Sequence, residues 1–200
     1  MPDDPAKEGK LIDPDNELML RVAKGDDEAF RKLFERHHRL AYSVIYRQLG
    51  NQSQAEDLVQ EAFLRVYRAA ATYQPAAKFS TWLFTVVTNL CLNFKRDQAR
   101  SKLRLLESSD EGENTLEQIA EAPPEDSDGD EREKRARLVR EAMQSLPETQ
   151  RMALILSRYE EKSYEEIAKI MDITVAAVKS LTSRARDTLR EKLQKYMDIE

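Results

Sequence analysis

The chain has 200 residues, of which 40% are hydrophobic and 34% are charged, and its formal net charge is −5. This composition supports one or two modest cores under a well-solvated surface and argues against collagen, a coiled coil or a disordered chain. One cysteine and two adjacent histidines exclude an internal disulfide and leave no plausible zinc set, so we expect no metal and no cofactor. No stretch approaches the roughly 18 apolar residues of a membrane span, and residues 1–10 do not resemble a signal peptide, which predicts a cytoplasmic protein.

The acidic residues are concentrated in two segments. Residues 107–133 contain twelve Asp and Glu against one basic residue, and residues 1–17 contain six against two. The rest of the chain contains 29 basic and 19 acidic residues, a positive surplus that suits nucleic-acid binding. Around Pro123-Pro124 there is too little apolar area to offset the entropy of ordering, which predicts a flexible linker. We therefore divide the chain into an acidic tail (1–15), a first domain (16–100), an acidic linker (101–133) and a second domain (134–200).

Apolar residues recur at helical spacing throughout the first domain, and no alternating strand pattern competes. A long helix is predicted to bury a stripe over residues 30–45, and a second helix a stripe over residues 58–67. Ser53 and Glu56 form a capping-box signature at the start of that second helix. After a proline-containing break, a third helix is predicted to face inward through Leu83, Val86, Val87, Leu90 and Phe94. The expected fold class is all-α.

The third predicted helix begins with aromatic side chains and continues with amide and then basic ones. Four of these share one helical face through spacings of four, three and four: Asn89, Asn93, Arg96 and Arg100. Aromatic rings beside amides and cations can stack on unpaired bases, hydrogen-bond their edges and neutralise phosphates. We interpret this region as a surface for single-stranded DNA. The alternative is that Phe79 and Trp82 are core residues.

In the second domain, residues 163–184 fit a helix-turn-helix. Ser163 and Glu166 form a capping box for its first helix. Asp172 tolerates the left-handed conformation that such a turn often needs, and Thr174 can cap the second helix.

The second helix of this motif is predicted to present short or basic side chains that suit the major groove. Ala168 and Val178 stand where the two helices should approach each other. The outward set is Val175, Ala176, Lys179, Ser180, Ser183 and Arg184, and Arg186 and Arg190 continue toward the DNA backbone. The alternative is an amphipathic helix pair with a solvated basic face.

Four motifs, in order along the chain, resemble those of the extracytoplasmic-function sigma factors, a group of the sigma-70 family of bacterial RNA polymerase. They are AEDLVQEAFLRVYR at 55–68, KFSTWL at 78–83, Leu146-Pro147, and SYEEIA at 163–168 with VKS at 178–180. The resemblance covers nearly the whole chain outside the tail and the linker. It implies a chain without enzymatic activity that binds core RNA polymerase, directs it to promoters and promotes DNA melting.

The resemblance also implies roles for individual residues. Those matching the polymerase-binding helix of the family are Asp57, Gln60, Glu61, Phe63 and Arg65. Those matching the part that captures the unpaired −10 element are Tyr73, Lys78, Phe79, Trp82, Asn89, Asn93, Arg96 and Arg100. The outward residues of the helix-turn-helix match the reader of the duplex −35 element. An anti-sigma factor is a further partner that the resemblance implies.

The chain departs from the family pattern in two places. The 73–78 loop lacks the glycine that is frequent there, which bears on the −10 base that is captured. Leu181 stands where an arginine is common, which removes a candidate phosphate contact. Both departures concern promoter sequence and leave the resemblance intact.

Three other functions compete with this reading of the sequence. An ordinary helix-turn-helix repressor or activator would bind duplex DNA without polymerase. An enzyme would need His37 and His38 or Cys91 as its chemistry, but no third group stands at motif spacing. A DNA-mimicking adaptor would use the acidic linker and leave the basic side chains of Arg96 and Arg184 unexplained.

Overall fold

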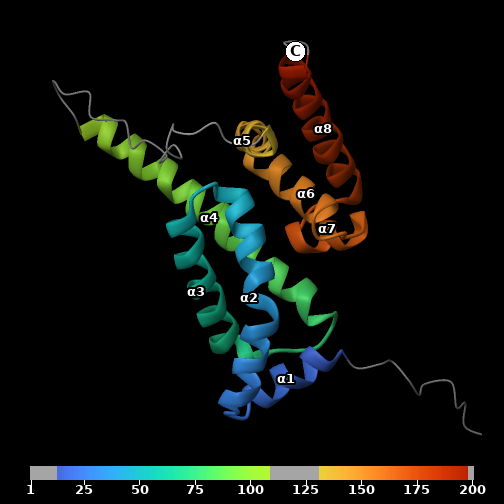
Figure 1. The fold of residues 1–200 in the computed structure, drawn as a ribbon. Coiled ribbons are helices and arrows are strands. Elements are labelled where there is room, and N and C mark those ends of the chain that lie inside the picture. Colours follow the sequence, from blue (N-terminus) through green and yellow to red (C-terminus); the bar gives the residue numbers. More distant parts are fainter. Residues whose placement is uncertain (1–12, 109–130, 198–200) are drawn as a thin grey trace, which may run out of the picture.

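The computed structural model describes residues 13–108 and 131–197, and every regular element in these ranges is a helix. The first domain contains α1 (Pro14–Val22), α2 (Asp27–Leu49), α3 (Gln52–Ala69), the short 3-10 helix η1 (Ala70–Thr72) and α4 (Phe79–Ser108). The second contains α5 (Glu131–Gln144), α6 (Glu148–Arg158), α7 (Tyr164–Met171) and α8 (Val175–Met197) (Figure 1). The all-α prediction is confirmed. Within these ranges, no helix combines the length and apolar character needed to cross a membrane.

The domain boundaries differ from the predicted ones mainly at the end of the first domain. Helix α4 continues to Ser108, past the boundary predicted at residue 100. Residues 101–108 contain the helix formers Lys, Arg and Leu and no glycine or proline, so nothing in this segment ends the helix. The rest of the predicted linker up to residue 130, and residues 1–12 of the tail, lie outside the described residues.

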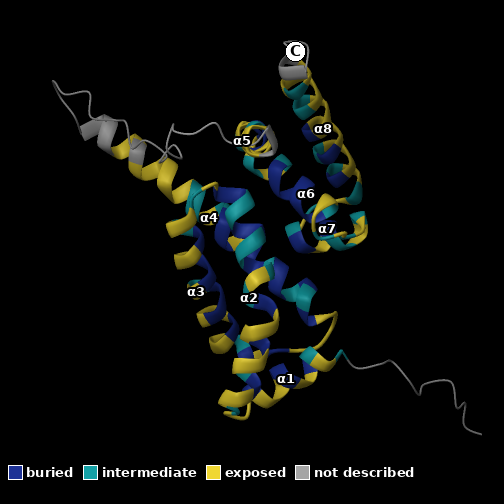
Figure 2. Ribbon diagram, viewed as in Figure 1, coloured by how far each residue is buried: buried dark blue, intermediate teal, exposed yellow. Residues whose placement is uncertain are grey.

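Helix α2 is the centre of the first domain and packs against α1, α3 and α4. Most of its predicted apolar stripe is confirmed, since Leu33, Val44 and Ile45 are fully buried, but Phe34 of the same stripe is 37% exposed. The side of the helix opposite the stripe faces solvent (Figure 2). A left-handed Gly50, at φ 74°, ends the helix and turns the chain directly into α3.

The cap of α3 differs from the predicted one. The Asn51 side chain accepts a hydrogen bond from Gln54 N at 2.9 Å, so Asn51 is the N-cap. Ser53 and Glu56 lie inside the helix, and the capping box predicted from them is wrong. The reason is that α3 starts immediately after the glycine turn, two residues earlier than the Ser53 signature implies.

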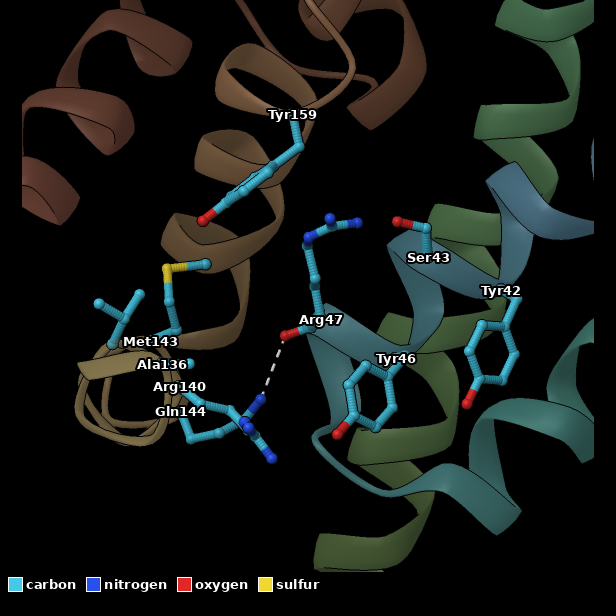
Figure 3. Close-up of a pocket in the computed structure, with 10 residues that line it drawn as sticks. Tyr42, Ser43, Tyr46, Arg47, Ala136, Arg140, Met143, Gln144 and Tyr159 are labelled. Carbon is cyan, nitrogen blue, oxygen red and sulfur yellow. Dashed lines mark hydrogen bonds between the residues drawn. The ribbon is translucent and has the colours of Figure 1, made fainter. Parts of the chain in front are cut away.

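The two domains pack directly against each other, which the sequence did not predict. Helix α7 lies against α4, and α5 and α6 lie against α2. Gln48 Nε2 donates to the carbonyl of Glu148, and Gln144 Nε2 donates to the carbonyl of Arg47, both at 3.1 Å. Figure 3 shows the second bond beside a cleft of about 360 Å³, in which the Arg47 guanidinium lies 4.4 Å from the ring centre of Tyr159.

A buried arginine joins the three helices at this seam. Arg151 of α6 is 4% exposed, and its guanidinium donates to the carbonyl of Gln48 at the end of α2. It also donates to the carbonyls of Met143, Gln144 and Leu146 around the end of α5. The last carbonyls of a helix have no partner within the helix, so one side chain supplies donors to two helix ends at once.

Candidate nucleic-acid interface

Helices α7 and α8 form the helix-turn-helix that the sequence predicts. The Ser163 hydroxyl accepts from Glu166 N at 3.2 Å, and the Glu166 carboxylate accepts from Ser163 N at 2.9 Å, a contact that lowers the pKa of Glu166. Asp172 is left-handed, with φ 53°, and makes the turn. Thr174 Oγ1 then accepts from Ala177 N at 3.2 Å and caps α8. The predicted capping box, turn and second cap are all confirmed.

Buried small and apolar residues fix the orientation of α8. Ala168 and Val178 lie at the predicted approach of the two helices and are 8% and 0% exposed, respectively. Thr182 is also buried, and its hydroxyl donates to the carbonyl of Val178 at 2.9 Å. One side of α8 is therefore held against α6 and α7, and the opposite side faces solvent.

The solvent side of α8 contains the residues predicted to read duplex DNA. Ala176, Lys179, Ser180, Ser183, Arg184 and Arg186 are all exposed, whereas Val175, which was predicted to face outward, is half-buried and packs against the core. Short side chains let a helix approach base edges closely, while lysine and arginine reach phosphates and guanine. Leu181 is half-buried, in keeping with inward packing where the family often has an arginine.

Helix α4 is covered on two of its sides. Leu83, Val87 and Leu90 are buried in the first domain. A different side meets the second domain: Lys162 Nζ lies 5.0 Å from the ring centre of Phe84. Further along this side, burial lowers the pKa of Lys95, and the positive charge of Arg151 in α6 lowers it further.

The third side of α4 is open to solvent and contains the polar residues predicted to meet unpaired DNA. Asn89, Asn93, Arg96 and Arg100 are all exposed. The Arg96 guanidinium donates to Asn93 Oδ1 at 2.9 Å, so an amide and a cation are held side by side. This pair offers hydrogen-bonding groups for base edges next to a positive charge for phosphate.

The aromatic residues of the predicted single-strand surface lie deeper than expected. Phe79 is fully buried and Tyr73 is 9% exposed, and their ring centres are 6.4 Å apart. Burial, with a smaller contribution from Asp13, raises the pKa of Tyr73 to about 12. Trp82 is half-buried, with its ring centre 5.0 Å from that of Tyr73. Phe79 and Tyr73 therefore cannot stack on bases in this structure, because their rings form part of the core.

The loop that precedes α4 is attached to α1. Asp13 Oδ1 accepts from Asp15 N at 3.1 Å, and its Oδ2 accepts from Phe79 N at 2.8 Å, so one carboxylate caps both α1 and α4. Asn16, in the first turn of α1, hydrogen-bonds to the Tyr73 side chain just before the loop 74–78 and to the backbone of Ala77 near its end. The sequence interpretation missed both residues. Aspartate before a proline signals a helix start, but it does not reveal the second helix that is capped.

The α3 surface presents most of the residues predicted to bind polymerase. Asp57 and Gln60 are exposed, and the Glu61 carboxylate pairs with Arg65 at 2.7 Å along the helix. Phe63 is 3% exposed, so it belongs to the core and does not present its ring to a partner.

A groove of about 480 Å³ lies beside this α3 surface, between α2 and α3. Its lining includes Phe34, His38, Val59 and Gln60. Phe34 is 37% exposed, its ring stacks on that of His38, and it contacts Phe63 edge to face at 4.8 Å. The sequence interpretation placed Phe34 in a buried stripe and therefore missed the apolar part of this surface.

The described structure is thus all-helical and has an exposed polar and basic helix face on each of its two domains. Residues 33–101 match the family described as Sigma-70 region 2, and residues 136–189 match the family described as Sigma-70, region 4. The chain belongs to the sigma-70 family, and its relatives place it among the extracytoplasmic-function (ECF) sigma factors. Members of this family give bacterial RNA polymerase its promoter specificity.

The similarity to characterised ECF sigma factors extends over most of the chain. The ECF RNA polymerase sigma-E factor of Escherichia coli K12 is 35% identical over 185 residues, which cover 90% of this chain and 94% of that protein. The ECF RNA polymerase sigma factor SigW of Bacillus subtilis is 31% identical over 184 residues, covering 89% and 98%.

Two solved structures share the fold. The sigma factor RpoE of Bartonella quintana, in complex with the anti-sigma factor NepR, has a TM-score of 0.64 at 24% identity and covers 82% of this chain and 96% of that one. CnrH, in complex with the cytosolic domain of CnrY, has a TM-score of 0.64 at 23% identity and covers 92% and 99%.

Proposed function

We propose that this ECF sigma factor binds core RNA polymerase and directs it to promoters by reading duplex DNA with α8 and unpaired DNA with α4. The observation that carries the proposal is the pair of exposed polar and basic surfaces, one on each domain. A single duplex reader would account for α8 and leave the exposed amide and arginine face of α4 without a role. The two surfaces together fit two states of the same promoter.

In the −35 element, the exposed side of α8 enters the major groove. Lys179 and Arg184 contact phosphates or base acceptors, and the short side chains of Ala176, Ser180 and Ser183 permit close approach. The buried side of α8 holds this surface in place, and the Asp172 turn and the Thr174 cap fix the N-terminus of the helix.

In the −10 element, α4 and the preceding loop capture unpaired bases. Asn89 and Asn93 supply donors and acceptors to base edges, while Lys78, Arg96 and Arg100 neutralise the backbone. The exposed edge of Trp82 is the remaining aromatic contact, and Tyr73 and Phe79 support it from the core. Melting follows from binding energy that favours the open strand over the duplex, so the chain requires no catalytic residue.

The polymerase docks on α3. Asp57, Gln60 and Arg65 provide its polar contacts, Phe34 provides an apolar one, and Phe63 acts by supporting Phe34. Because core RNA polymerase works in the cytoplasm, we propose the same location for this chain.

An anti-sigma factor is a further proposed partner. Of the two solved sigma factors described above, RpoE is in complex with the anti-sigma factor NepR, and CnrH is in complex with the cytosolic domain of CnrY. A regulator that binds either reader surface or the α3 surface would prevent initiation.

Run-off transcription with core polymerase and genomic DNA fragments tests the proposal. The wild-type chain should produce new, discrete start sites. Lys179→Ala should reduce initiation about tenfold on duplex templates, and premelting the −10 region should not restore it. Asn89→Ala should reduce initiation similarly, but premelting should restore most of it. Lys24→Ala, at an exposed lysine in the turn between α1 and α2 that belongs to neither predicted surface, should behave as wild type.

A chain that binds duplex DNA without polymerase, and adds no start sites in its presence, would instead be a helix-turn-helix repressor or activator. Capture of core polymerase by the immobilised chain separates these two functions before any promoter is known.

A further inference from the structure

Asn16 joins the two ends of the loop that precedes α4. Its Nδ2 donates to the carbonyl of Ala77 at 2.9 Å, and its Oδ1 accepts from the Tyr73 hydroxyl at 2.5 Å. Asn16 is 6% exposed, and Tyr73 is nearly as buried. Both halves of the amide are therefore used in bonds that join Tyr73, directly before the loop 74–78, to Ala77 near its end.

The loop has little else to fix its shape. Residues 74–78 are all exposed, so no packing against the core holds them. Within the loop, Ala76 N donates to the carbonyl of Gln74 at 2.8 Å, a short local turn. The loop also lacks glycine, and Pro75 restricts its own φ and the conformation of Gln74 but none of the other loop residues. Its conformation thus depends on the two points at which Asn16 holds it and on the Asp13 cap at the start of α4.

We propose that Asn16 is a positioning residue for the captured −10 base, acting through the bridge Tyr73–Asn16–Ala77 on the loop 74–78. The inference rests on the proposed function, in which this loop and α4 receive unpaired bases. Asn16 itself is buried beneath the loop, so it selects the loop conformation without touching DNA. A loop held in one conformation loses less entropy on binding and discriminates better between bases than a loop with several conformations.

The bridge requires a side chain that donates and accepts at once. Asparagine provides both groups at fixed geometry. Asn16→Leu keeps a similar volume and removes both bonds, whereas Tyr73→Phe keeps the ring in the core and removes one of them. If the bridge acts as a unit, adding Tyr73→Phe to Asn16→Leu should change nothing further.

The test measures open-complex formation by run-off transcription on duplex and premelted templates, with each single-base substitution in the −10 element. We expect Asn16→Leu to reduce initiation on duplex templates roughly three- to tenfold, the effect of one or two lost hydrogen bonds. The preference among −10 bases should flatten, and premelted templates should restore initiation. Tyr73→Phe should show a smaller change in the same direction. Glu17→Gln, an exposed neighbour in α1, is the control and should match wild type.

All measurements are made at a temperature at which circular dichroism shows every variant to be fully folded. Binding to core polymerase and to a −35 duplex should stay within about twofold of wild type, since neither surface involves Asn16. An unchanged base preference, or a loss that premelting does not restore, would overturn the positioning role and leave Asn16 as a stability residue. Failure of the proposed function looks different, because the wild-type chain would then direct no promoter-specific initiation at all.

Discussion

Replacing Arg151 by methionine removes the guanidinium that joins α2, α5 and α6 while keeping most of the side-chain volume. The wild-type guanidinium is 4% exposed and donates to four backbone carbonyls and to the Gln144 side chain. A buried acceptor that loses its partner costs about 1–3 kcal/mol, and water will reach some of these carbonyls after the change. We therefore expect the free energy of unfolding of the second domain to fall by about 3–5 kcal/mol.

Equilibrium urea unfolding measures this change with two probes. Far-UV circular dichroism follows both domains, and fluorescence of Trp82, the single tryptophan, follows the first domain. In Arg151→Met the circular dichroism transition should begin at lower urea than the Trp82 transition, because the second domain and its contact with α2 are lost first. Arg158→Met is the matched control, since Arg158 is an exposed arginine of the same helix. Equal midpoint shifts in the two variants would refute the assigned role of Arg151.

Three further predictions concern single sites. Gly50→Ala should lower the free energy of unfolding by about 1–2 kcal/mol, because Gly50 has φ 74° and an added Cβ would lie 2.8 Å from the Gln144 side chain. An unaltered urea midpoint would contradict this prediction. Ser163→Ala should cost about 1 kcal/mol in the same assay through loss of the α7 cap, and a neutral effect would mean that the capping box contributes nothing. Burial raises the pKa of the Cys91 thiol to about 12, so at pH 8 the native chain should react with thiol reagents far more slowly than the urea-unfolded chain. The native Arg151→Met variant should react faster than the native wild-type chain. Rapid labelling of the native wild-type chain would show that Cys91 is accessible.

Local patterns in the sequence predicted the helices and the helix-turn-helix because the interactions that set them are short in range. The Ser163 and Glu166 box and the Thr174 cap each join residues three positions apart, and Asp172 takes its left-handed conformation within one turn. Helical periodicity likewise predicted that one side of α8 would be exposed. The Ser53 and Glu56 box was wrong for the same local reason, since Gly50 and Asn51 offered a better helix start.

Periodicity was less informative about aromatic residues near the candidate surfaces. The structure buries Phe63, Tyr73 and Phe79, all three named as partner contacts. For Phe63 and Phe79 the sequence had also offered the buried alternative, in an inward stripe and in the core, but it did not decide between the two. It placed Phe34 in the core, whereas the structure leaves it more than a third exposed. An aromatic ring suits both a core and a binding surface, so its burial depends on the helices that surround it.

The sequence by itself determined the family, the all-helical fold and the exposed polar and basic faces of α4 and α8, because motifs and helical faces depend on residues within a few turns of one another. Only the tertiary structure decided which polar groups meet across the chain. Asn16 lies 57 residues from Tyr73 and 61 from Ala77, and Arg151 lies 103 from Gln48. A single sequence contains no periodic signal for such pairs, since they form only when packing of the apolar faces brings distant helices together.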